Sequence, residues 1–240
     1  GRGFNHNISV LNGSANGTTS TTVSAVGGNV FENDRAGIFG QAKYNFKEKY
    51  FIDGTLRRDG SSKFGLKNRY GTFYAGSIGW RITKEAFMES VKDQISELKL
   101  RASYGYTGNS EINDYQNITT FSSGIQYAGI TGLRPTVLGN DLLTWEGSRQ
   151  INLALDYGFL RNGRIFGSLD FWRRDTEDAL FSVSLAADAG QRPASVTRNV
   201  GTIRNQGIDF EVGAAILDNP EKLQWTSSFN ITFQQNKVLS

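Results

Sequence analysis

The stretch that decides the fold is Tyr50–Ile82, YFIDGTLRRDGSSKFGLKNRYGTFYAGSIGWRI. It opens with apolar residues at alternate positions, and the alternation returns after a polar, Gly-containing segment at 58–69. Successive side chains leave a β-strand on opposite faces, so a period of two is typical of a strand with one apolar face. The stretch therefore predicts a ribbon of two strands joined by a polar loop. Its apolar positions include Tyr50, Ile52, Leu56, Tyr74, Ile78, Trp80 and Ile82.

The same pattern recurs along the chain and predicts about nine strands in an all-β fold. The predicted strands are 4–11, 34–46, 49–58, 70–83, 97–107, 145–159, 164–177, 203–216 and 223–236. Many of them run for about 9–14 residues, whereas strands of globular proteins have about 5–6 and a tilted strand that crosses a bilayer needs about 9–11. Strand length therefore favours a membrane-spanning sheet.

The composition of the 240 residues agrees with strands and turns rather than with helices. Hydrophobic residues make up 38%, mean hydropathy is −0.40, and there are 28 Gly but only 3 Pro. No apolar run approaches the roughly 18 residues of a transmembrane helix. A transmembrane β-barrel passes this test, because only every other residue of its strands must be apolar.

Charge and cysteine usage exclude several classes of protein. The net charge is only +3 and basic residues are scattered among acidic ones, so no nucleic-acid partner is expected. There is no Cys, which excludes disulfides and thiolate metal sites. The chain starts at Gly1 without a signal segment and stops within a predicted strand, so we expect a fragment of a longer protein.

The predicted connections alternate between short and long, which is typical of outer-membrane barrels. The short ones are 47–48, 160–163, 217–222 and, by parity, 84–96; the long ones are 12–33, 59–69, 108–144 and 178–202. We expect one or two helical turns in 84–96 and a small hairpin in 108–144. The Asn/Gly/Ser/Thr-rich segment 12–33 has little to bury and is predicted to be mobile.

Alternation alone fits two kinds of protein. In a soluble β-sandwich that binds carbohydrate or serves as a scaffold, the apolar phase packs between two sheets. In a large barrel the apolar phase faces lipid and the polar phase lines a lumen. Aromatic residues gather near strand ends on the apolar phase, as at a membrane interface, and Arg101, Asp156 and Asp209 lie inside strands on the polar phase. These features favour the barrel.

Five segments resemble the β-barrel of SusC/RagA-type TonB-dependent outer-membrane receptors, in order and in spacing. They are LRRDGSSKFGLKNRYGTFYAGSIGWRI (56–82), LKLRASYGYTGN (98–109), LTWEGSRQINLALDYGFLRNGRIFGSLDFWRRDTEDAL (143–180), RNVGTIRNQGIDFEVGAAI (198–216) and WTSSFNITFQQNKV (225–238). The resemblance covers the chain from about Asp34 onward. It implies an antiparallel meander that forms part of a 22-stranded transmembrane barrel.

The resemblance also implies a function and partners. Residues 1–240 would be a partial barrel domain, and the plug, the TonB-contacting segment, the signal peptide and the closing strands would lie outside this sequence. The expected function is import of oligosaccharides or peptides across the bacterial outer membrane. The expected partners are a SusD-type surface lipoprotein, the TonB complex and outer-membrane lipid. Substrate-binding residues are not specified by the resemblance.

The residues give no reason to expect an enzyme, a cofactor or a metal. His6 is the only histidine, which excludes a histidine-dependent triad and a multi-histidine metal site. The carboxylate pairs Asp156/Asp170 and Asp209/Glu211 resemble glycosidase pairs only in residue type, so no catalytic residue is predicted. Asp59, Gly60 and Asn68 are interpreted as turn residues.

Loop and rim residues leave further alternatives open. The group Glu111/Asn113/Asp114 offers oxygen ligands for Ca²⁺ but lacks EF-hand spacing, so a solvated loop is the preferred interpretation. The basic pairs Arg57/Arg58 and Arg173/Arg174 are interpreted as a solvated rim, with lipopolysaccharide or plug carboxylates as the alternative contacts. Four aromatic residues are candidates for stacking on sugars, although no spacing rule selects them: Tyr115, Phe121, Tyr127 and Trp145.

Overall fold

A computed structural model describes residues 32–128, 130–186, 195–219 and 223–239. Gly1–Glu32 forms a unit separate from Asn33–Ser240. The predicted strand at 4–11, His6 and nearly all of the predicted mobile segment at 12–33 therefore lie outside the described residues. The second unit contains all of the described strands.

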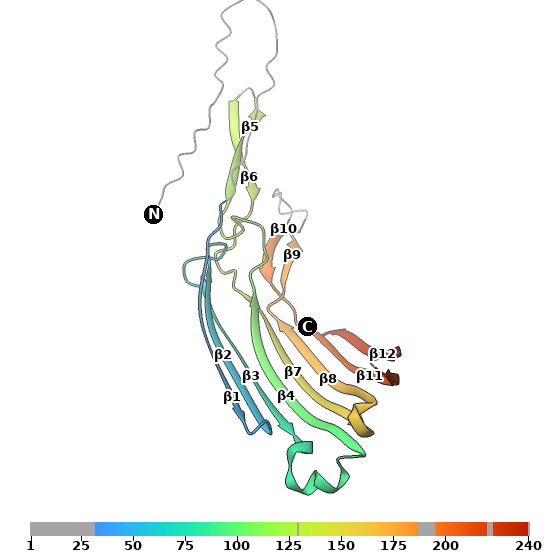
Figure 1. Ribbon diagram of the computed structural model, residues 1–240. Coiled ribbons are helices and arrows are strands. Elements are labelled where there is room, and N and C mark those ends of the chain that lie inside the picture. Colours follow the sequence, from blue (N-terminus) through green and yellow to red (C-terminus); the bar gives the residue numbers. More distant parts are fainter. Residues whose placement is uncertain (1–31, 129, 187–194, 220–222, 240) are drawn as a thin grey trace, which may run out of the picture. The chain divides into compact units, whose positions relative to one another are not determined.

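Eight long strands form one antiparallel sheet in which each strand pairs with the next (Figure 1). They are β1 (Arg35–Phe46), β2 (Tyr50–Ser61), β3 (Tyr70–Arg81), β4 (Ile95–Asn109), β7 (Glu146–Phe159), β8 (Ile165–Glu177), β11 (Ile203–Asn219) and β12 (Leu223–Val238). All eight were predicted from the period-two alternation. The meander topology predicted from the sequence is confirmed.

The connections also follow the predicted alternation. Short turns join β1 to β2 and β7 to β8; in the first, Lys47 and Glu48 both have positive φ (54° and 56°), as a tight hairpin turn requires. The segment between β3 and β4 contains two short 3₁₀ helices, η1 (Ile82–Lys84) and η2 (Ala86–Val91), and η3 (Arg161–Gly163) lies in the β7–β8 turn. The helical turns predicted for 84–96 are thus present as 3₁₀ helices.

Two small hairpins are inserted in the long loops. The hairpin predicted within 108–144 is β5 (Thr120–Tyr127) and β6 (Ile130–Val137). A second pair, β9 (Leu180–Ser184) and β10 (Ser195–Asn199), was not predicted. No helix in the described part of the chain is long and hydrophobic enough to cross a bilayer.

The register places hydrophobic residues in continuous rows across all eight strands. One row, from β1 to β12, is Phe46, Tyr50, Trp80, Leu100, Leu155, Leu169, Phe210 and Ile231; the next is Tyr44, Ile52, Ile78, Ala102, Leu153, Phe171, Ile208 and Phe233. Paired residues of adjacent strands share a face of the sheet. We call the face with these rows the outer face and the opposite face the inner face.

The hydrophobic rows are not covered by any described part of the chain. Leu100, Leu153 and Phe233 are 43%, 51% and 64% exposed, although each is a large apolar residue. A soluble sandwich would bury them against a second sheet, but the described residues form only this sheet and the two small hairpins. The sandwich alternative is therefore wrong, and the outer face has the character of a lipid-facing wall.

Aromatic residues lie on the outer face near both ends of the strands, as predicted. Near the short-turn end, Tyr44 stacks on Phe46 and Phe46 on Tyr50, with ring centroids 6.4 and 6.5 Å apart. Near the loop end, Tyr74 lies 6.2 Å from Tyr104 and 5.8 Å from Tyr106. Rings of this kind are typical of the two membrane interfaces.

Candidate functional site

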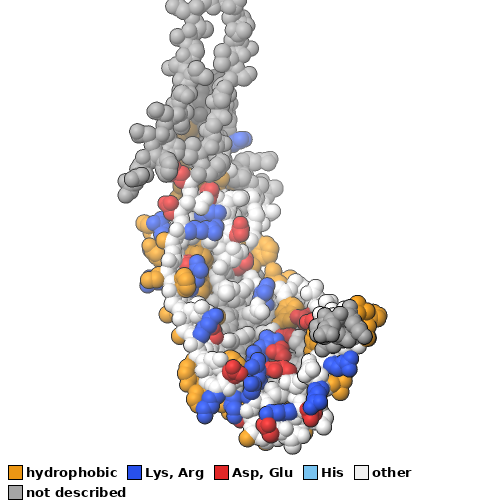
Figure 2. Space-filling model, viewed as in Figure 1, with side chains coloured by type: hydrophobic (Ala, Val, Ile, Leu, Met, Phe, Trp, Pro, Cys, Tyr) orange, Lys and Arg blue, Asp and Glu red, His pale blue; other side chains and the backbone are white. Residues whose placement is uncertain are grey.

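The inner face carries a network of charges in the middle of the sheet. Arg101 on β4 donates from Nε and Nη2 to the carboxylate of Asp156 on β7, at 2.8 and 2.7 Å. The same Nη2 lies 3.4 Å from Asp170 Oδ1 on β8. Figure 2 shows basic and acidic side chains interspersed on the face in view, with hydrophobic side chains gathered toward its margins. A polar wall of this kind suits a lumen that holds water or another polar protein surface.

This network explains one predicted carboxylate pair. Asp156 and Asp170 are brought together by a shared arginine, Arg101, which leaves one negative charge in excess. That neither carboxylate is catalytic stays a prediction. In the second pair, Asp209 lies opposite Asp170 in the register, while Glu211 is exposed further along β11. Asp209 Oδ1 is buried and accepts no hydrogen bond from the described residues. It is the one buried carboxylate oxygen on the described inner face that lacks a partner.

At the loop end of the sheet, three loops share a small hydrophobic core. Phe64 and Leu143 are fully buried and Ile112 is 9% exposed, and Trp145 and Leu180 pack against them. We call the described residues of 62–69, 110–119, 138–145 and 178–202 the loop cap. Burial of these side chains supplies the main driving force for ordering the cap.

Polar contacts join the same loops. Asn68 Nδ2 donates to the carbonyl oxygens of Leu142 and Leu143, at 3.1 and 3.2 Å. Asn199 Nδ2 donates to the Thr144 carbonyl at 2.8 Å, and its Oδ1 accepts from the Thr144 amide at 2.9 Å. These side chains hold backbone groups that would otherwise lack partners, so the cap is a packed structure rather than a set of independent loops.

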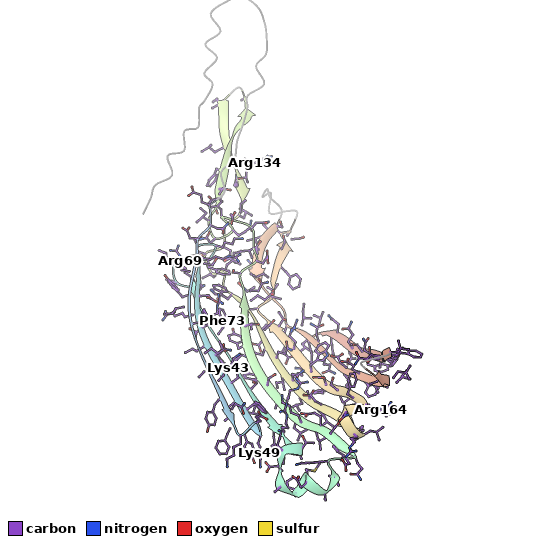
Figure 3. All side chains as sticks on the ribbon, viewed as in Figure 1. Lys43, Lys49, Arg69, Phe73, Arg134 and Arg164 are labelled. Atoms are coloured by element: carbon purple, nitrogen blue, oxygen red, sulfur yellow. The ribbon has the colours of Figure 1, made fainter. Side chains whose placement is uncertain are left out.

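Phe73 closes the gap where β3 and β4 separate below the cap. It is 6% exposed, and Figure 3 shows it on β3, on the loop-side part of the sheet. A Cβ on Gly108 would lie 2.0 Å from its Cζ, and one on Gly71 would lie 2.4 Å from the same atom. The ring therefore requires glycine at both positions. It packs at 5.2 Å against Trp145, which links the sheet to the cap.

A cavity of about 500 Å³ lies between the inner face and this aromatic pair. Its lining includes Arg57, Asp59, Phe73, Asn109 and Trp145. Arg57 Nε donates to Asp59, so the wall presents a charge pair beside two aromatic rings. The cavity thus combines apolar ring surface with charged and amide groups, as polar organic ligands require. Asp59 and Gly60, predicted to be turn residues, instead lie within β2 and pair with both neighbouring strands, and the cavity was not predicted from the sequence.

The other predicted residues have structural roles or other positions. Trp145 packs against the cap core, with Nε1 donating to the Arg69 carbonyl at 3.3 Å, and its ring also lines the cavity, so its stacking on a sugar stays a prediction. Phe121 is 59% exposed on β5. Tyr115 lies in the cap with positive φ, and the side chain of Tyr127 is outside the described part.

Of the possible Ca²⁺ ligands, Asp114 lies beside a lysine. Lys63 Nζ lies 3.5 Å from Asp114 Oδ1 and donates to the Ile112 carbonyl at 2.6 Å. Among the described residues there is no group of three acidic, histidine or cysteine side chains able to hold a metal ion. The interpretation of this segment as a solvated loop stays a prediction.

The two basic pairs straddle the sheet as predicted. Arg57 and Arg174 are on the inner face, the latter donating to Gln150 Oε1 at 3.0 Å. Arg58 and Arg173 are on the outer face, where Arg58 lies over the Tyr70 ring at 5.5 Å. Each pair therefore has one arginine on the inner face and one on the outer face.

At the short-turn end, Glu85 accepts three hydrogen bonds. Tyr50 Oη and Trp80 Nε1 donate to Oε1 at 2.7 and 3.1 Å, and Lys49 Nζ donates to Oε2 at 3.0 Å. Figure 3 shows Lys49 at this end of the sheet. The donors, Tyr50 first, lower the pKa of Glu85 from 4.5 to about 2. Glu85 thereby fastens the 3₁₀ segment to two aromatic residues of the interface.

Glu85→Gln should loosen this segment at neutral pH, because the amide loses the ion pair and the strongest acceptor. A lowered pKa means that the stabilising effect is complete above pH 4.5 and is lost as the pH falls toward 2. In the wild type, amide hydrogen exchange at 82–94, corrected for intrinsic rates, should rise as the pH falls from 4.5 toward 2. In the Glu85→Gln variant it should be high at every pH. Glu89→Gln, which removes only an exposed pair with Lys92, is the control. If Glu85→Gln and Glu89→Gln showed the same exchange at 82–94, Glu85 would not be what holds this segment.

Comparison with known proteins agrees with a barrel wall of the outer membrane. The family model described as "TonB dependent receptor-like, beta-barrel" matches residues 1–239. TonB-dependent receptor P39 of Formosa agariphila is 34% identical over 98% of this chain, and TonB-dependent receptor SusC of Bacteroides thetaiotaomicron is 34% identical over 86%. The chain spans 21% of the length of either relative.

Solved structures show the same similarity. The RagAB peptide importer in its closed-closed state matches 85% of this chain and 22% of its own, with 31% identity and a TM-score of 0.76. The siderophore receptor PirA from Pseudomonas aeruginosa shares the fold, with 15% identity and a TM-score of 0.56.

The uncovered apolar face, the polar inner face and the alternating loops define a segment of a transmembrane β-barrel. The chain belongs to the TonB-dependent receptor β-barrel family. Members of this family are bacterial outer-membrane transporters rather than enzymes. The resemblance seen in the sequence is confirmed.

Proposed function

We propose that this chain is part of the wall of a transporter that imports bulky nutrients, oligosaccharides or peptides, with energy from the TonB complex. All of residues 1–240 would belong to the barrel domain, with the plug and the closing strands supplied by the rest of the full-length receptor. The observation that carries the proposal is the contrast between the sheet's two faces: Leu153 is exposed on one, while Arg101 binds carboxylates on the other.

The charged inner face supports the proposal that a polar plug packs against it. Arg101 and its two carboxylates place charged groups on this face. Asp209 lines a polar hollow on this face with Asn152 and Arg174, so its carboxylate offers an acceptor to a donor on the plug.

The cavity beneath the loop cap supports capture of substrate at the loop end. The Arg57–Asp59 pair offers donors and acceptors, and Phe73 and Trp145 offer ring surface, to a peptide or an oligosaccharide. RagAB is described as a peptide importer. We infer that a SusD-type surface lipoprotein covers the loops of this receptor and that substrate is held between the two proteins.

A matched pair of neighbouring residues tests the cavity. Arg57→Gln should raise the KM for uptake about tenfold, since a hydrogen bond to a charged group contributes about 1.5–3 kcal/mol. Arg58→Gln, on the outer face, should leave uptake unchanged. The measurement is uptake of labelled oligosaccharides and peptides by cells that produce the full-length receptor and its lipoprotein, with and without a functional TonB complex.

The same assay tests the proposed function itself. Uptake of one substrate class should require both the receptor and the TonB complex, and the lipoprotein should co-purify with the receptor. Uptake that persists without the TonB complex would contradict energised import. Equal KM values for the two arginine variants would contradict the role of the cavity but not energised import itself.

A further inference from the structure

Charged residues replace apolar ones on the outer face at the loop end of three neighbouring strands. Arg173 and Asp175 on β8, Arg204 on β11 and Lys237 on β12 all occupy positions of the apolar phase. Asp175 pairs with Arg204 in the register, and Arg204 with Lys237. We call these four residues the outer basic cluster. Charges on the lipid-facing side of a membrane protein carry a cost and usually have a function.

One carboxylate in this cluster pairs with two of its three cations. Arg173 Nη2 and Arg204 Nε each lie 2.7 Å from an oxygen of Asp175. Lys237 forms no ion pair within the described part of the chain and lies directly opposite Arg204, where like charges repel. The cluster therefore has two positive charges in excess of its own carboxylate. An anion at this point would remove the repulsion.

The cluster encloses a hollow of about 180 Å³ suited to a small anionic group. Arg204, Lys237, Gln206, Gln235 and Leu239 line it, and Gln206 Nε2 donates to Gln235 Oε1 at 3.3 Å. Guanidinium, ammonium and amide groups thus point toward one small volume from two strands. Such a set of donors matches a phosphate, whose several oxygens accept hydrogen bonds at once.

Apolar surface continues from the cluster toward the middle of the sheet. Phe171, Ile208 and Phe233 lie in one row there and are 44%, 46% and 64% exposed. Phe171 also borders an apolar groove of about 690 Å³ with Ala102 and Leu153. The strands end one or two residues beyond Asp175, Arg204 and Lys237, so the charges lie at the headgroup level of the outer leaflet.

We propose that the outer basic cluster binds a phosphate of lipopolysaccharide, the phosphorylated and multiply acylated glycolipid of the outer leaflet. The phosphate occupies the hollow between Arg204 and Lys237, and the acyl chains lie along Phe171, Ile208 and Phe233. A zwitterionic phospholipid fits less well, since its ammonium group would approach the same cations. The bound glycolipid would fix this part of the wall in the leaflet.

The test uses the full-length receptor, delipidated in detergent and titrated with purified rough-type lipopolysaccharide. Retained lipid is counted by native mass spectrometry, with phosphatidylethanolamine and inorganic phosphate as separate probes. The double variant Arg204→Gln/Lys237→Gln should bind about twenty-fivefold more weakly, since each basic residue near an anionic membrane surface contributes a factor of about five. The single variant Lys237→Gln should bind about fivefold more weakly.

Arg174→Gln is the matched control, because Arg174 is adjacent to Arg173 but faces inward. Its affinity for lipopolysaccharide should equal that of the wild type. The proposal is overturned if the double variant binds like the wild type, if Arg174→Gln weakens binding equally, or if phosphatidylethanolamine or equimolar phosphate displaces lipopolysaccharide. If the double variant lacks the heat-sensitive gel mobility of a folded barrel, Lys237→Gln decides the outcome.

Discussion

Leu153→Arg is expected to destabilise the barrel by about 2–4 kcal/mol, the cost of an arginine on the lipid-facing side near the bilayer midplane. Leu153 lies in the middle of β7 and is 51% exposed on the outer face. Its register neighbours are Ala102 and Phe171, which offer no opposite charge. A guanidinium there would have to bend toward an interface several residues away. Less folded receptor should therefore accumulate in the outer membrane.

Asn152→Arg provides the control at the adjacent position. Asn152 is on the inner face, between Ser103 and Trp172 in the register, where a polar wall accommodates a further charge. The amount of full-length receptor with heat-sensitive mobility in isolated outer membranes, and its midpoint of guanidinium unfolding, should fall for Leu153→Arg only. If both variants were equally stable, the hydrophobic rows would not face hydrocarbon and the transporter assignment would lose its physical basis.

The strands were predictable because one period of two runs through each of them. The ends were harder, and β11 shows why. The alternation predicts an end at residue 216, but the strand continues to Asn219 after an irregularity between Ala215 and Leu217. The extra residue shifts the phase, so Leu217 pairs with Trp225 on the apolar side. A local pattern cannot reveal a bulge that only the partner strand defines.

The loop cap was not predictable for a different reason. Its contacts join residues far apart in the chain, such as Asn68 and Leu142, which differ by 74 positions. Loop sequences carry no periodicity that would show Phe64 and Leu143 to be fully buried. Trp145 was therefore interpreted only as a candidate for sugar stacking, and its packing against the cap core was not predicted.

The outer basic cluster did leave a signal in the sequence. Arg173, Asp175 and Arg204 stand where the alternation of β8 and β11 calls for apolar residues. The neighbouring arginines at 173 and 174 were interpreted as a solvated rim that straddles both faces, with lipopolysaccharide or plug carboxylates as the alternative contacts. The register was needed to show that Arg204 and Lys237 join Arg173 on one side. Cross-strand neighbours, unlike neighbours in sequence, are visible only in the folded sheet.

Phe64→Ala is expected to destabilise the loop cap by about 3–5 kcal/mol, the usual cost of removing a fully buried aromatic side chain. Phe64 is 0% exposed, and its ring centroid lies 5.2 Å from that of Trp145. The ring fills the space between the 62–69 loop and the chain around Leu143. Since Phe64 lies outside the strands, the loss should open the cap and leave the eight-stranded sheet intact.

Hydrogen–deuterium exchange in the full-length receptor distinguishes opening of the loop cap from loss of the sheet. Amides of 62–69, 110–119 and 140–145 should lose protection in Phe64→Ala, while those of β4 and β7 keep it. Leu66→Ala is the control, because Leu66 lies in the same loop but is 80% exposed. Equal exchange in the two variants would show that the cap is not held by its core. Because Trp145 joins this core to Phe73, loss of the cap should also open the cavity beside Arg57 and raise the KM for import more than Leu66→Ala does.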